Sequence, residues 1–341
     1  MNEGRDVLLE VKGLKKYFPV QRGFLRRTVG YVKAVDDVSL YVRAGETLGV
    51  VGESGCGKTT LGRCIVRLYQ PTAGEIYLRD GERVLPVHNL DSKDMRTFRR
   101  SVQIIFQDPF SSLNPRMNVL ETVGEPLLVN GIAKGKELEE RVTEVIQQVG
   151  LRVEHLRRYP HSFSGGQRQR IGIARALVVR PKLIVADEPV SALDVSIQAQ
   201  ILNLLKELQE RFQLTYIFVS HAMSVIRYVS DRIAVMYAGK LVEIGPKDEL
   251  LANPKHPYTE ALLAAAPRIS LRRRGKRMVT LGEPPDLANL PSGCVFHPRC
   301  KYAQEICKVT PPELKPMGPD YFVSCHLAEE LELQGISTPG R

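Results

Sequence analysis

The sequence predicts an α/β fold with a mainly parallel sheet, and three observations carry this prediction. Short β-like runs alternate with helical patterns along much of the chain, which is typical of βαβ construction. A polar, helix-rich stretch at about residues 112–178 interrupts the alternation and indicates a helical insertion. Beyond about residue 254, prolines, arginines and cysteines become dense and periodicity fades, which indicates a small C-terminal module.

Composition places limits on the protein. A chain of 341 residues with 43% hydrophobic content can bury a large core, as two domains or one domain with an extension. No run of about 18 apolar residues occurs, so we expect no membrane-spanning helix. The N-terminus lacks the apolar core of a secretory signal, so we expect a cytoplasmic protein. The chain has six cysteines, and the expected cytosolic location argues against disulfides between them. The net charge of +10 is compatible with nucleic acid, an anionic membrane surface or nucleotides, or simply with a solvated basic surface.

The individual elements follow from local patterns. Apolar, β-branched runs predict strands at residues 8–11, 32–42, 47–51, 75–78, 102–106, 183–186, 215–219 and 233–237. Helical spacing predicts helices at residues 60–68, over the set Leu138, Val142, Val145, Ile146 and Val149, and over the set Ile197, Ile201, Leu204, Leu205, Leu208 and Phe212.

A glycine-rich loop follows the strand at 47–51 and precedes a helix. It fits the pattern G-x-x-x-x-G-K-[ST], whose backbone N–H groups cradle phosphate oxygens. We expect Lys58 to contact the β- and γ-phosphates of ATP, the Thr59 hydroxyl to bind Mg²⁺, and the helix N-terminus to add positive potential. The loop consists of Gly52, Glu53, Ser54, Gly55, Cys56, Gly57, Lys58 and Thr59.

The apolar run at residues 183–186 ends in Asp187-Glu188. A buried strand places Asp187 where it can hold Mg²⁺, directly or through water, and Glu188 where it can polarise an attacking water. An acidic helix cap is the ordinary alternative, but the position about 130 residues after a phosphate loop favours the ATPase interpretation.

Further motifs resemble those of ABC-type ATPases, in the order and spacing of that family over roughly residues 7–250. The resemblance implies a P-loop NTPase (RecA-like) core with an antiparallel β-subdomain and an inserted α-helical subdomain at about 108–178. It divides the chain into an ATPase domain at 1–255 and a C-terminal module at 256–341. The matching motifs are the signature Ser164-Gly165-Gly166-Gln167, the D-loop Ser191-Ala192-Leu193-Asp194, the switch residue His221 and the Q-loop residue Gln107.

The signature opens a helix, so its N–H groups and dipole form a second anion site in a chain that already has a phosphate loop. In the family this site caps the ATP of the opposite subunit, so two chains sandwich two nucleotides. The resemblance assigns His221 to the γ-phosphate and catalytic water, Gln107 to Mg²⁺ and signalling to a membrane partner, and Thr60 and Asp194 to the nucleotide site. Phe18 or Tyr17 would stack on adenine, although either ring could instead pack in the core.

Several stretches resemble the dipeptide/oligopeptide importers, and their F-type ATPase subunit in particular. They are residues 16–20, 32–36, 107–116 and 256–263. Such importers contain two transmembrane permease subunits, two different ATPase subunits and an external solute-binding protein. The resemblance therefore implies a D-type ATPase partner, a peripheral location at the cytoplasmic face of the inner membrane, and no nucleic acid. A nickel-chelate importer, a soluble ABC ATPase acting on nucleic acid or the ribosome, and an iron–sulfur sensor with an incidental ATPase are the alternatives.

Four cysteines crowd the C-terminal module, spaced C-x5-C-x6-C-x17-C. Four thiols in a cytosolic, loop-rich segment suit Zn²⁺ or an iron–sulfur cluster, and four free thiols are the alternative. Resemblance to the importer branch favours a [4Fe–4S] cluster with a structural or regulatory role. The basic run at residues 272–277 predicts a solvated linker, or a contact with anionic lipid headgroups. The four cysteines are Cys294, Cys300, Cys307 and Cys325.

Overall fold

The computed structural model describes residues 7–23, 27–265, 283 and 285–336, so the basic run at 272–277 lies outside the described residues. The chain forms two compact units, and neither is continuous in sequence. We call them the helical unit (Met1–Leu9, Val42–Glu46 and Tyr77–Phe218) and the loop unit (Glu10–Tyr41, Thr47–Ile76 and Val219–Arg341), after their main features. In the described part of the chain, no helix combines the length and apolar character that crossing a bilayer requires.

The loop unit is built on a sheet whose strands follow the order β11-β12-β10-β9-β3. Strand β3 runs parallel to β9, with Val50 opposite Ala234, whereas β9 and β10 form an antiparallel pair. Every residue of β3 and of β9 is buried, and both strands are mainly apolar after their first residues, Thr47 and Arg232. The strands are β3 (Thr47–Val51), β9 (Arg232–Tyr237), β10 (Lys240–Pro246), β11 (Lys315–Gly318) and β12 (Tyr321–Val323).

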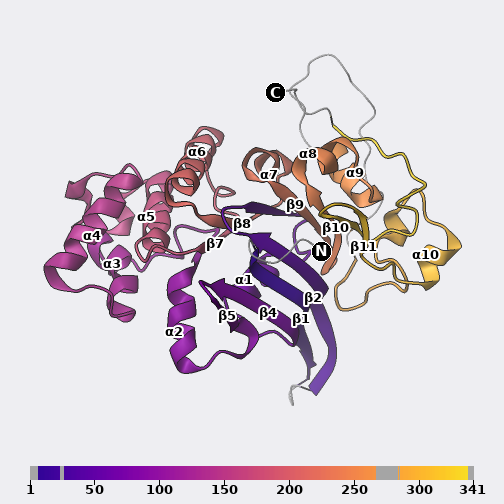
Figure 1. Ribbon diagram of the computed structural model, residues 1–341, viewed down its shortest axis with the longest axis horizontal. Helices are drawn as coiled ribbons and strands as arrows, with labels where there is room; N and C mark the ends of the chain where they lie inside the picture. Colours follow the sequence, from indigo (N-terminus) through magenta and orange to yellow (C-terminus); the bar gives the residue numbers. More distant parts are fainter. Residues whose placement is uncertain (1–6, 24–26, 266–282, 284, 337–341) are drawn as a thin grey trace. The chain divides into compact units, whose positions relative to one another are not determined.

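The C-terminal segment extends this sheet, which its sequence did not predict. Strand β12 pairs antiparallel with β10, with Glu243 opposite Val323, and β11 pairs with β12. Figure 1 shows α10 and β11 of this segment in yellow. Local periodicity is weak there because β11 and β12 have four and three residues, too few to display an alternation.

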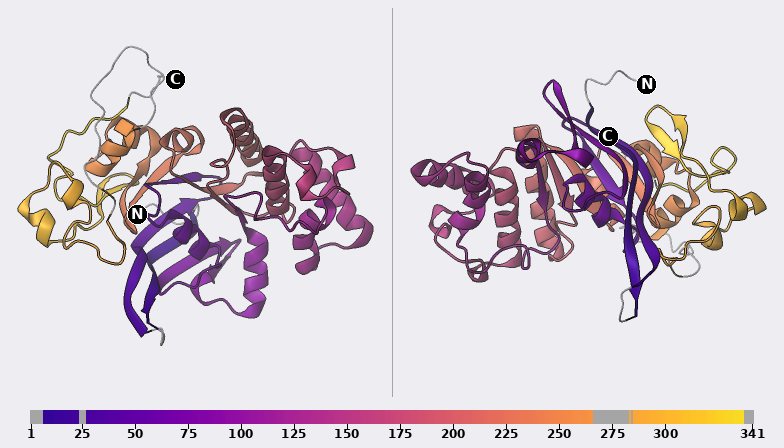
Figure 2. Two further views of the ribbon diagram at one scale, coloured as in Figure 1. Left: turned by 180° about the vertical axis from the view of Figure 1, so that it is seen from behind. Right: turned by 90° about the horizontal axis from the view of Figure 1, so that it is seen from below.

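Helices of the loop unit pack against its strands. Helix α7 lies against β3, where a Cβ on Gly49 would come within 2.7 Å of the Ile226 side chain. Two long neighbouring strands, β1 and β2, form the extended indigo ribbon of Figure 2. These elements are β1 (Val7–Arg22), β2 (Arg27–Arg43), α1 (Lys58–Ile65), α7 (Met223–Val229), α8 (Lys247–Ala252), α9 (Pro257–Ala265) and α10 (Glu305–Val309).

The helical unit contains the insertion that the sequence predicted. Helices α3, α4 and α5 pack on one another, and they cluster together in Figure 1. Gly124 of α3 allows this approach, because a Cβ there would lie 2.8 Å from the Leu138 side chain of α4. Strands β6 and β7 pair in parallel, with Val102 opposite Leu183. The elements are β5 (Arg83–Pro86), α2 (Ser92–Ser101), β6 (Val102–Ile105), α3 (Val119–Val129), α4 (Gly135–Gln148), α5 (Gly165–Leu177), β7 (Leu183–Asp187) and α6 (Val195–Phe212).

The boundaries between the two units fall within four strands of the sequence. The boundary falls at residue 9/10 in β1, 41/42 in β2, 76/77 in β4 (Ala73–Asp80) and 218/219 in β8 (Thr215–Ser220). The predicted strands at 47–51, 102–106, 183–186, 215–219 and 233–237 are confirmed to within about one residue at either end. The mixed α/β class is therefore confirmed.

Candidate functional site

The phosphate loop connects β3 to α1 in the loop unit, as its motif requires. Gly57 adopts φ = 106°, and a Cβ there would lie 2.0 Å from the Ala34 carbonyl oxygen, so only glycine fits. Gly57 is also the N-cap of α1, and no side chain caps that end. The first turn of α1 carries no acidic residue, so its N-terminal N–H groups and dipole offer a site for an anion.

Lys58 is held beneath this loop. Its side chain is buried, and its Nζ donates to the Gly52 carbonyl at 2.7 Å and to the Glu53 carbonyl at 2.8 Å. These are backbone carbonyls rather than a carboxylate, so the formal positive charge of Lys58 is not neutralised by them. The Sγ of buried Cys56 lies 3.7 Å away, and burial raises the pKa of that thiol. The loop thus holds a positioned cation, as phosphate binding requires.

The loop is anchored by residues that the sequence did not single out for this role. The Glu53 N–H donates to the Tyr258 hydroxyl at 2.8 Å. The Glu53 carboxylate receives two hydrogen bonds from Arg299, at 2.8 and 2.9 Å. Tyr258 lies in the stretch 256–263, whose only sequence signal is its family resemblance, and no sequence signal marks Arg299. The C-terminal segment therefore contributes directly to the conformation of the phosphate loop.

The two aromatic candidates for adenine stacking have different surroundings. The Tyr17 hydroxyl donates to Asp36, and burial together with this hydrogen bond raises the pKa of Tyr17. Phe18 packs edge-on against Tyr69, with 5.5 Å between the ring centroids, and Lys16 lies over its ring. Both rings are only partly buried, so both remain candidates.

The predicted acidic pair lies at the end of β7 in the helical unit. Asp187 is buried, and Glu188 follows with φ = 46°, a left-handed conformation that non-glycine residues rarely adopt. Gln107 donates from Nε2 to the Glu188 carboxylate at 3.0 Å. The structure thus brings together the proposed general base and the Q-loop glutamine, which lie 81 residues apart in sequence. Strained backbone of this kind concentrates at functional sites.

The signature motif begins helix α5. Ser164 is the N-cap, and its Oγ accepts from the Gln167 N–H at 3.3 Å. The Gln167 side chain in turn accepts from the Ser164 N–H at 3.1 Å, which completes a capping box. A Cβ on Gly166 would lie 2.6 Å from the Ile197 side chain, and one on Gly165 3.4 Å from Leu193. The signature therefore packs against the D-loop and the start of α6.

Two arginines of α5 join the signature helix to the segment that follows Gln107. Arg168 lies over the Phe110 ring at 4.1 Å, and Arg175 donates to the Ser112 carbonyl at 2.7 Å. Burial lowers the pKa of Arg175. The segment that follows Gln107 therefore contacts the helix that carries the signature at two points. The predicted switch residue, His221, directly follows β8; it lies in the loop unit and is exposed.

All four C-terminal cysteines line one small cavity in the loop unit, together with three histidines. Burial raises the pKa of Cys294 to about 11, that of Cys325 to about 12, and that of Cys300. Among the described residues, no three His, Cys, Asp or Glu side chains stand in an arrangement that could hold a metal ion. Four thiols are a donor set that suits a thiolate-binding metal, but their side chains are not arranged around a metal position in this structure.

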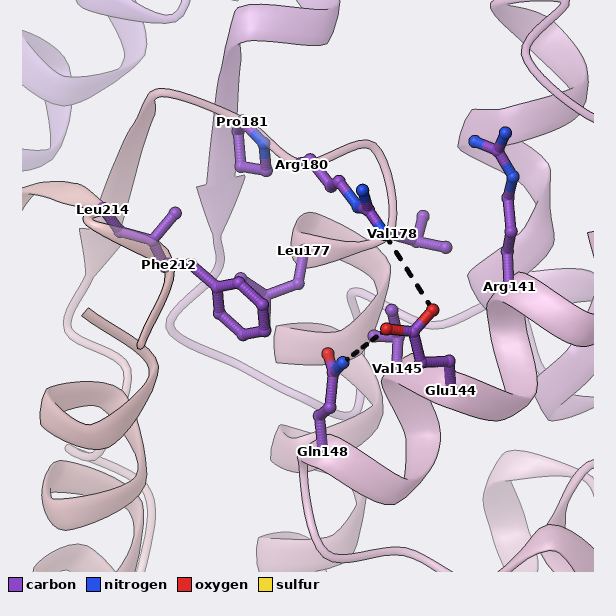
Figure 3. Close-up of a pocket in the computed structure, with 10 residues that line it drawn as sticks. All are labelled: Arg141, Glu144, Val145, Gln148, Leu177, Val178, Arg180, Pro181, Phe212 and Leu214. Atoms are coloured by element: carbon purple, nitrogen blue, oxygen red, sulfur yellow. Dashed lines mark hydrogen bonds and ion pairs between the residues drawn. The ribbon is translucent and has the colours of Figure 1, made fainter. Parts of the chain in front are cut away.

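Another cavity lies in the helical unit (Figure 3), between the ends of α4, α5 and α6. Its polar side carries Glu144, which pairs with Arg180 at 3.9 Å and accepts from Gln148 at 3.0 Å. Its apolar side includes Leu177 and Phe212. None of the predicted functional residues lines it.

Comparison with known proteins places these features in a family. A family model described as "ABC transporter" matches residues 35–191, and one described as "Oligopeptide/dipeptide transporter, C-terminal region" matches residues 242–307. The chain is 52% identical over 328 residues to the oligopeptide transport ATP-binding protein AppF of Bacillus subtilis (strain 168), covering 95% of this chain and 98% of that protein. It is 46% identical over 321 residues to the dipeptide transport ATP-binding protein DppF of Haemophilus influenzae, covering 93% and 96%.

Two solved structures resemble the fold. The ATP-binding cassette MJ0796, in a dimeric post-hydrolysis state bound to ADP and Pi, aligns with a TM-score of 0.61 and 30% identity. That alignment covers 70% of this chain and 99% of the cassette. The protein cbiO1 from Clostridium perfringens, part of the ABC transporter complex cbiONQ, aligns with a TM-score of 0.59 and 28% identity, covering 72% and 91%.

Proposed function

The chain belongs to the ATP-binding subunits of ABC transporters, in the branch with an oligopeptide/dipeptide C-terminal region, and we propose that it powers the import of dipeptides or oligopeptides. Subunits of this family are ATPases. The similarity of this chain to two peptide-transport ATP-binding proteins over more than nine tenths of its length carries the proposal. The ATPase domain is assigned to residues 1–255, its helical subdomain to about 108–178, and the C-terminal module to 256–341.

The sequence motifs give each residue of the proposed ATP site a distinct role. Residues 52–60 bind the phosphates of ATP, with Lys58 as the cation and Thr59 as a Mg²⁺ ligand. Asp187 holds the Mg²⁺, directly or through water, and Glu188 accepts the proton of the attacking water. Gln107 contributes to the Mg²⁺ site, and His221 contacts the γ-phosphate and the catalytic water. Asp194 belongs to the nucleotide site, and an aromatic ring, Phe18 or Tyr17, stacks on adenine.

Substitution of Glu188 tests the catalytic assignment. Glu188→Gln keeps the shape of the side chain but removes the base, so ATP hydrolysis should fall by at least about a hundredfold while ATP still binds. Glu207→Gln, on the exposed side of α6, is the matched control and should hydrolyse ATP normally. Steady-state turnover of Glu188→Gln at the wild-type rate would remove Glu188 from the mechanism.

We propose further that the signature of one chain completes the ATP site of another. The capped N-terminus of α5 is exposed at Ser164 and offers N–H groups to a phosphate. Turnover per chain should then rise with protein concentration. A turnover that is independent of concentration contradicts the composite site. Purification of the intact complex distinguishes a D-type ATPase partner from a second copy of this chain.

The same proposal assigns the chain to a complex with two permease subunits and an external solute-binding protein, at the cytoplasmic face of the membrane. Uptake of labelled peptide into proteoliposomes that contain the whole complex tests it, with Lys58→Ala as the inactive control. Uptake of a nickel chelate in place of peptide would assign another solute to this importer.

For the C-terminal cysteines we propose a bound [4Fe–4S] cluster, with Zn²⁺ as the alternative. The support is the donor set: four thiols line one cavity, and burial raises the pKa values of Cys294, Cys300 and Cys325. Ionisation of these thiols requires a compensating positive charge, which a metal supplies. Iron, acid-labile sulfide and zinc measured on protein purified without oxygen decide between the two. Protein that contains neither metal, and in which all six cysteines titrate as thiols after unfolding, would refute the proposal.

A further inference from the structure

The Arg299 side chain links the C-terminal segment to the phosphate loop. Its two terminal nitrogens donate to the two carboxylate oxygens of Glu53, at 2.8 and 2.9 Å. The Arg299 side chain is 7% exposed and that of Glu53 25%, so the pair is largely shielded from water. A shielded, two-point arginine–carboxylate contact fixes both distance and orientation, unlike a single ion pair at the surface.

Aromatic side chains hold Arg299 in this position. The guanidinium donates to the Tyr237 hydroxyl at 3.3 Å and lies 5.6 Å from the centre of that ring. Tyr237, Tyr258 and Phe296 pack together, with ring centroids 4.6 to 5.4 Å apart. Phe296 and Arg299 both belong to the short stretch between Cys294 and Cys300. We call this stretch, residues 294–300, the cysteine segment. Its Phe296 packs in the aromatic cluster, and this packing fixes the position of Arg299.

Every polar group of Glu53 is engaged. Its N–H donates to Tyr258, its carbonyl accepts from Lys58 Nζ at 2.8 Å, and its carboxylate receives Arg299. Displacement of the Glu53 side chain would therefore disturb the same residue whose carbonyl helps to hold Lys58. Glu53 is therefore the single residue that connects Arg299 to the Lys58 ammonium group.

The charge of Glu53 gives this contact a further consequence. Glu53 places a carboxylate within a loop whose ligand is a polyanion, and like charges at short range repel. The paired guanidinium compensates that carboxylate, and the contact raises the pKa of Arg299. Without Arg299, an uncompensated negative charge would remain where the nucleotide phosphates bind.

We propose that Arg299 is a positioning residue for ATP binding, which fixes Glu53 and neutralises its charge and so couples the cysteine segment to the phosphate loop. The inference rests on the proposed function of residues 52–60 as the nucleotide loop. It does not depend on whether the four thiols hold a metal. It assigns to the C-terminal segment a role in nucleotide affinity, in addition to any role of its cysteines.

Binding of a fluorescent ATP analogue to the purified full-length chain, competed with unlabelled ATP, tests the proposal. Arg299→Ala should weaken ATP binding by at least about fivefold. Glu53→Gln, which removes the charge but leaves Arg299 in place, should bind ATP as well as the wild type or better. The double variant Glu53→Gln/Arg299→Ala should recover to the affinity of Glu53→Gln alone, because no carboxylate then faces the phosphates.

A purely structural role of Arg299 predicts the opposite pattern. If Arg299 only supports packing of the C-terminal segment, the double variant should bind ATP no better than Arg299→Ala, and that result overturns the proposal. Should Arg299→Ala fail to fold, Glu53→Gln alone decides, because a loss of affinity in it contradicts the charge argument. Lys308→Ala is the matched control. Lys308 adjoins Cys307 as Arg299 adjoins Cys300, but it pairs with Glu305 at 2.5 Å and not with the phosphate loop. The Lys308→Ala variant should therefore bind ATP normally.

Lys58→Ala separates failure of this proposal from failure of the proposed function. If Lys58→Ala loses ATP binding while Arg299→Ala keeps the wild-type affinity, the loop is the nucleotide site and Arg299 has no role in it. If Lys58→Ala also binds ATP normally, the assignment of residues 52–60 is itself wrong.

Discussion

Removal of the Tyr321 hydroxyl should destabilise the loop unit, and by more at alkaline pH. Tyr321 belongs to β12 and donates to the Glu243 carboxylate of β10 at 2.6 Å. Glu243 is fully buried and also accepts from the N–H groups of Lys255 and His256, at 2.6 and 3.2 Å. Tyr321→Phe deletes one of these three hydrogen bonds without changing the packed ring.

The size of the effect follows from the charge state of Glu243. Burial raises its pKa from 4.5 to about 7, although its hydrogen bonds oppose that shift. The folded protein therefore binds this proton more tightly than the unfolded chain, and stability falls as pH rises through the interval between those two pKa values. Loss of a hydrogen bond to the ionised carboxylate should cost about 2 kcal/mol at pH 8.5, and loss of one to the neutral acid about 1 kcal/mol at pH 5.5.

Scanning calorimetry of the full chain measures this prediction. For a unit of this size, about 2 kcal/mol lowers Tm by ~4–8 °C and about 1 kcal/mol by ~2–4 °C. Tyr302→Phe is the control, because the Tyr302 hydroxyl donates to a carboxylate over a longer distance, 3.4 Å to Glu260, and its side chain is less buried. Equal shifts at both pH values, or an equal shift in Tyr302→Phe, would refute the reasoning.

Two glycine substitutions test the geometry of the proposed ATP sites. Gly57→Ala should abolish ATP binding, because the new methyl group would meet the Ala34 carbonyl at 2.0 Å. Gly55→Ala shares the cost of a positive φ, 80°, but its methyl group would meet no atom within 4 Å, so it should bind ATP more strongly than Gly57→Ala in the same titration. Gly166→Ala should cost about 1–3 kcal/mol by overpacking against Ile197, only 2.6 Å away, and lower ATPase activity. If Ile197→Ala restores both stability and ATPase activity to that variant, packing explains the loss; restored stability without activity would assign the loss to nucleotide contact.

The sequence predicted the elements whose signals are local. The apolar run of β3, the glycines after it and Lys58 lie within a dozen consecutive residues, so motif and structure coincide. The helical insertion was predictable for a similar reason: α4 repeats its apolar residues at helical spacing, and α5 begins with the capping box of Ser164 and Gln167.

Contacts between distant residues were not predictable from such patterns. Glu53 and Arg299 are 246 positions apart, and neither a charged residue in a loop nor an arginine before a cysteine specifies its partner. The pairing of β12 with β10 was missed because three residues carry no recognisable alternation. The hydrogen bond from Gln107 to Glu188 joins two predicted residues, yet only the fold could place them within 3.0 Å.

By itself the sequence determined the α/β class and the family, because these depend on short motifs in a fixed order. For the same reason it predicts, in the proposed mechanism, the residues that bind and hydrolyse nucleotide. The tertiary structure decided that the cysteine segment packs in the same compact unit as the phosphate loop and holds its Glu53 through Arg299. The physical reason is that charge pairing and burial depend on distances in space. The separation of two residues along the chain does not give these distances, which are set only when the sheet and its helices have formed.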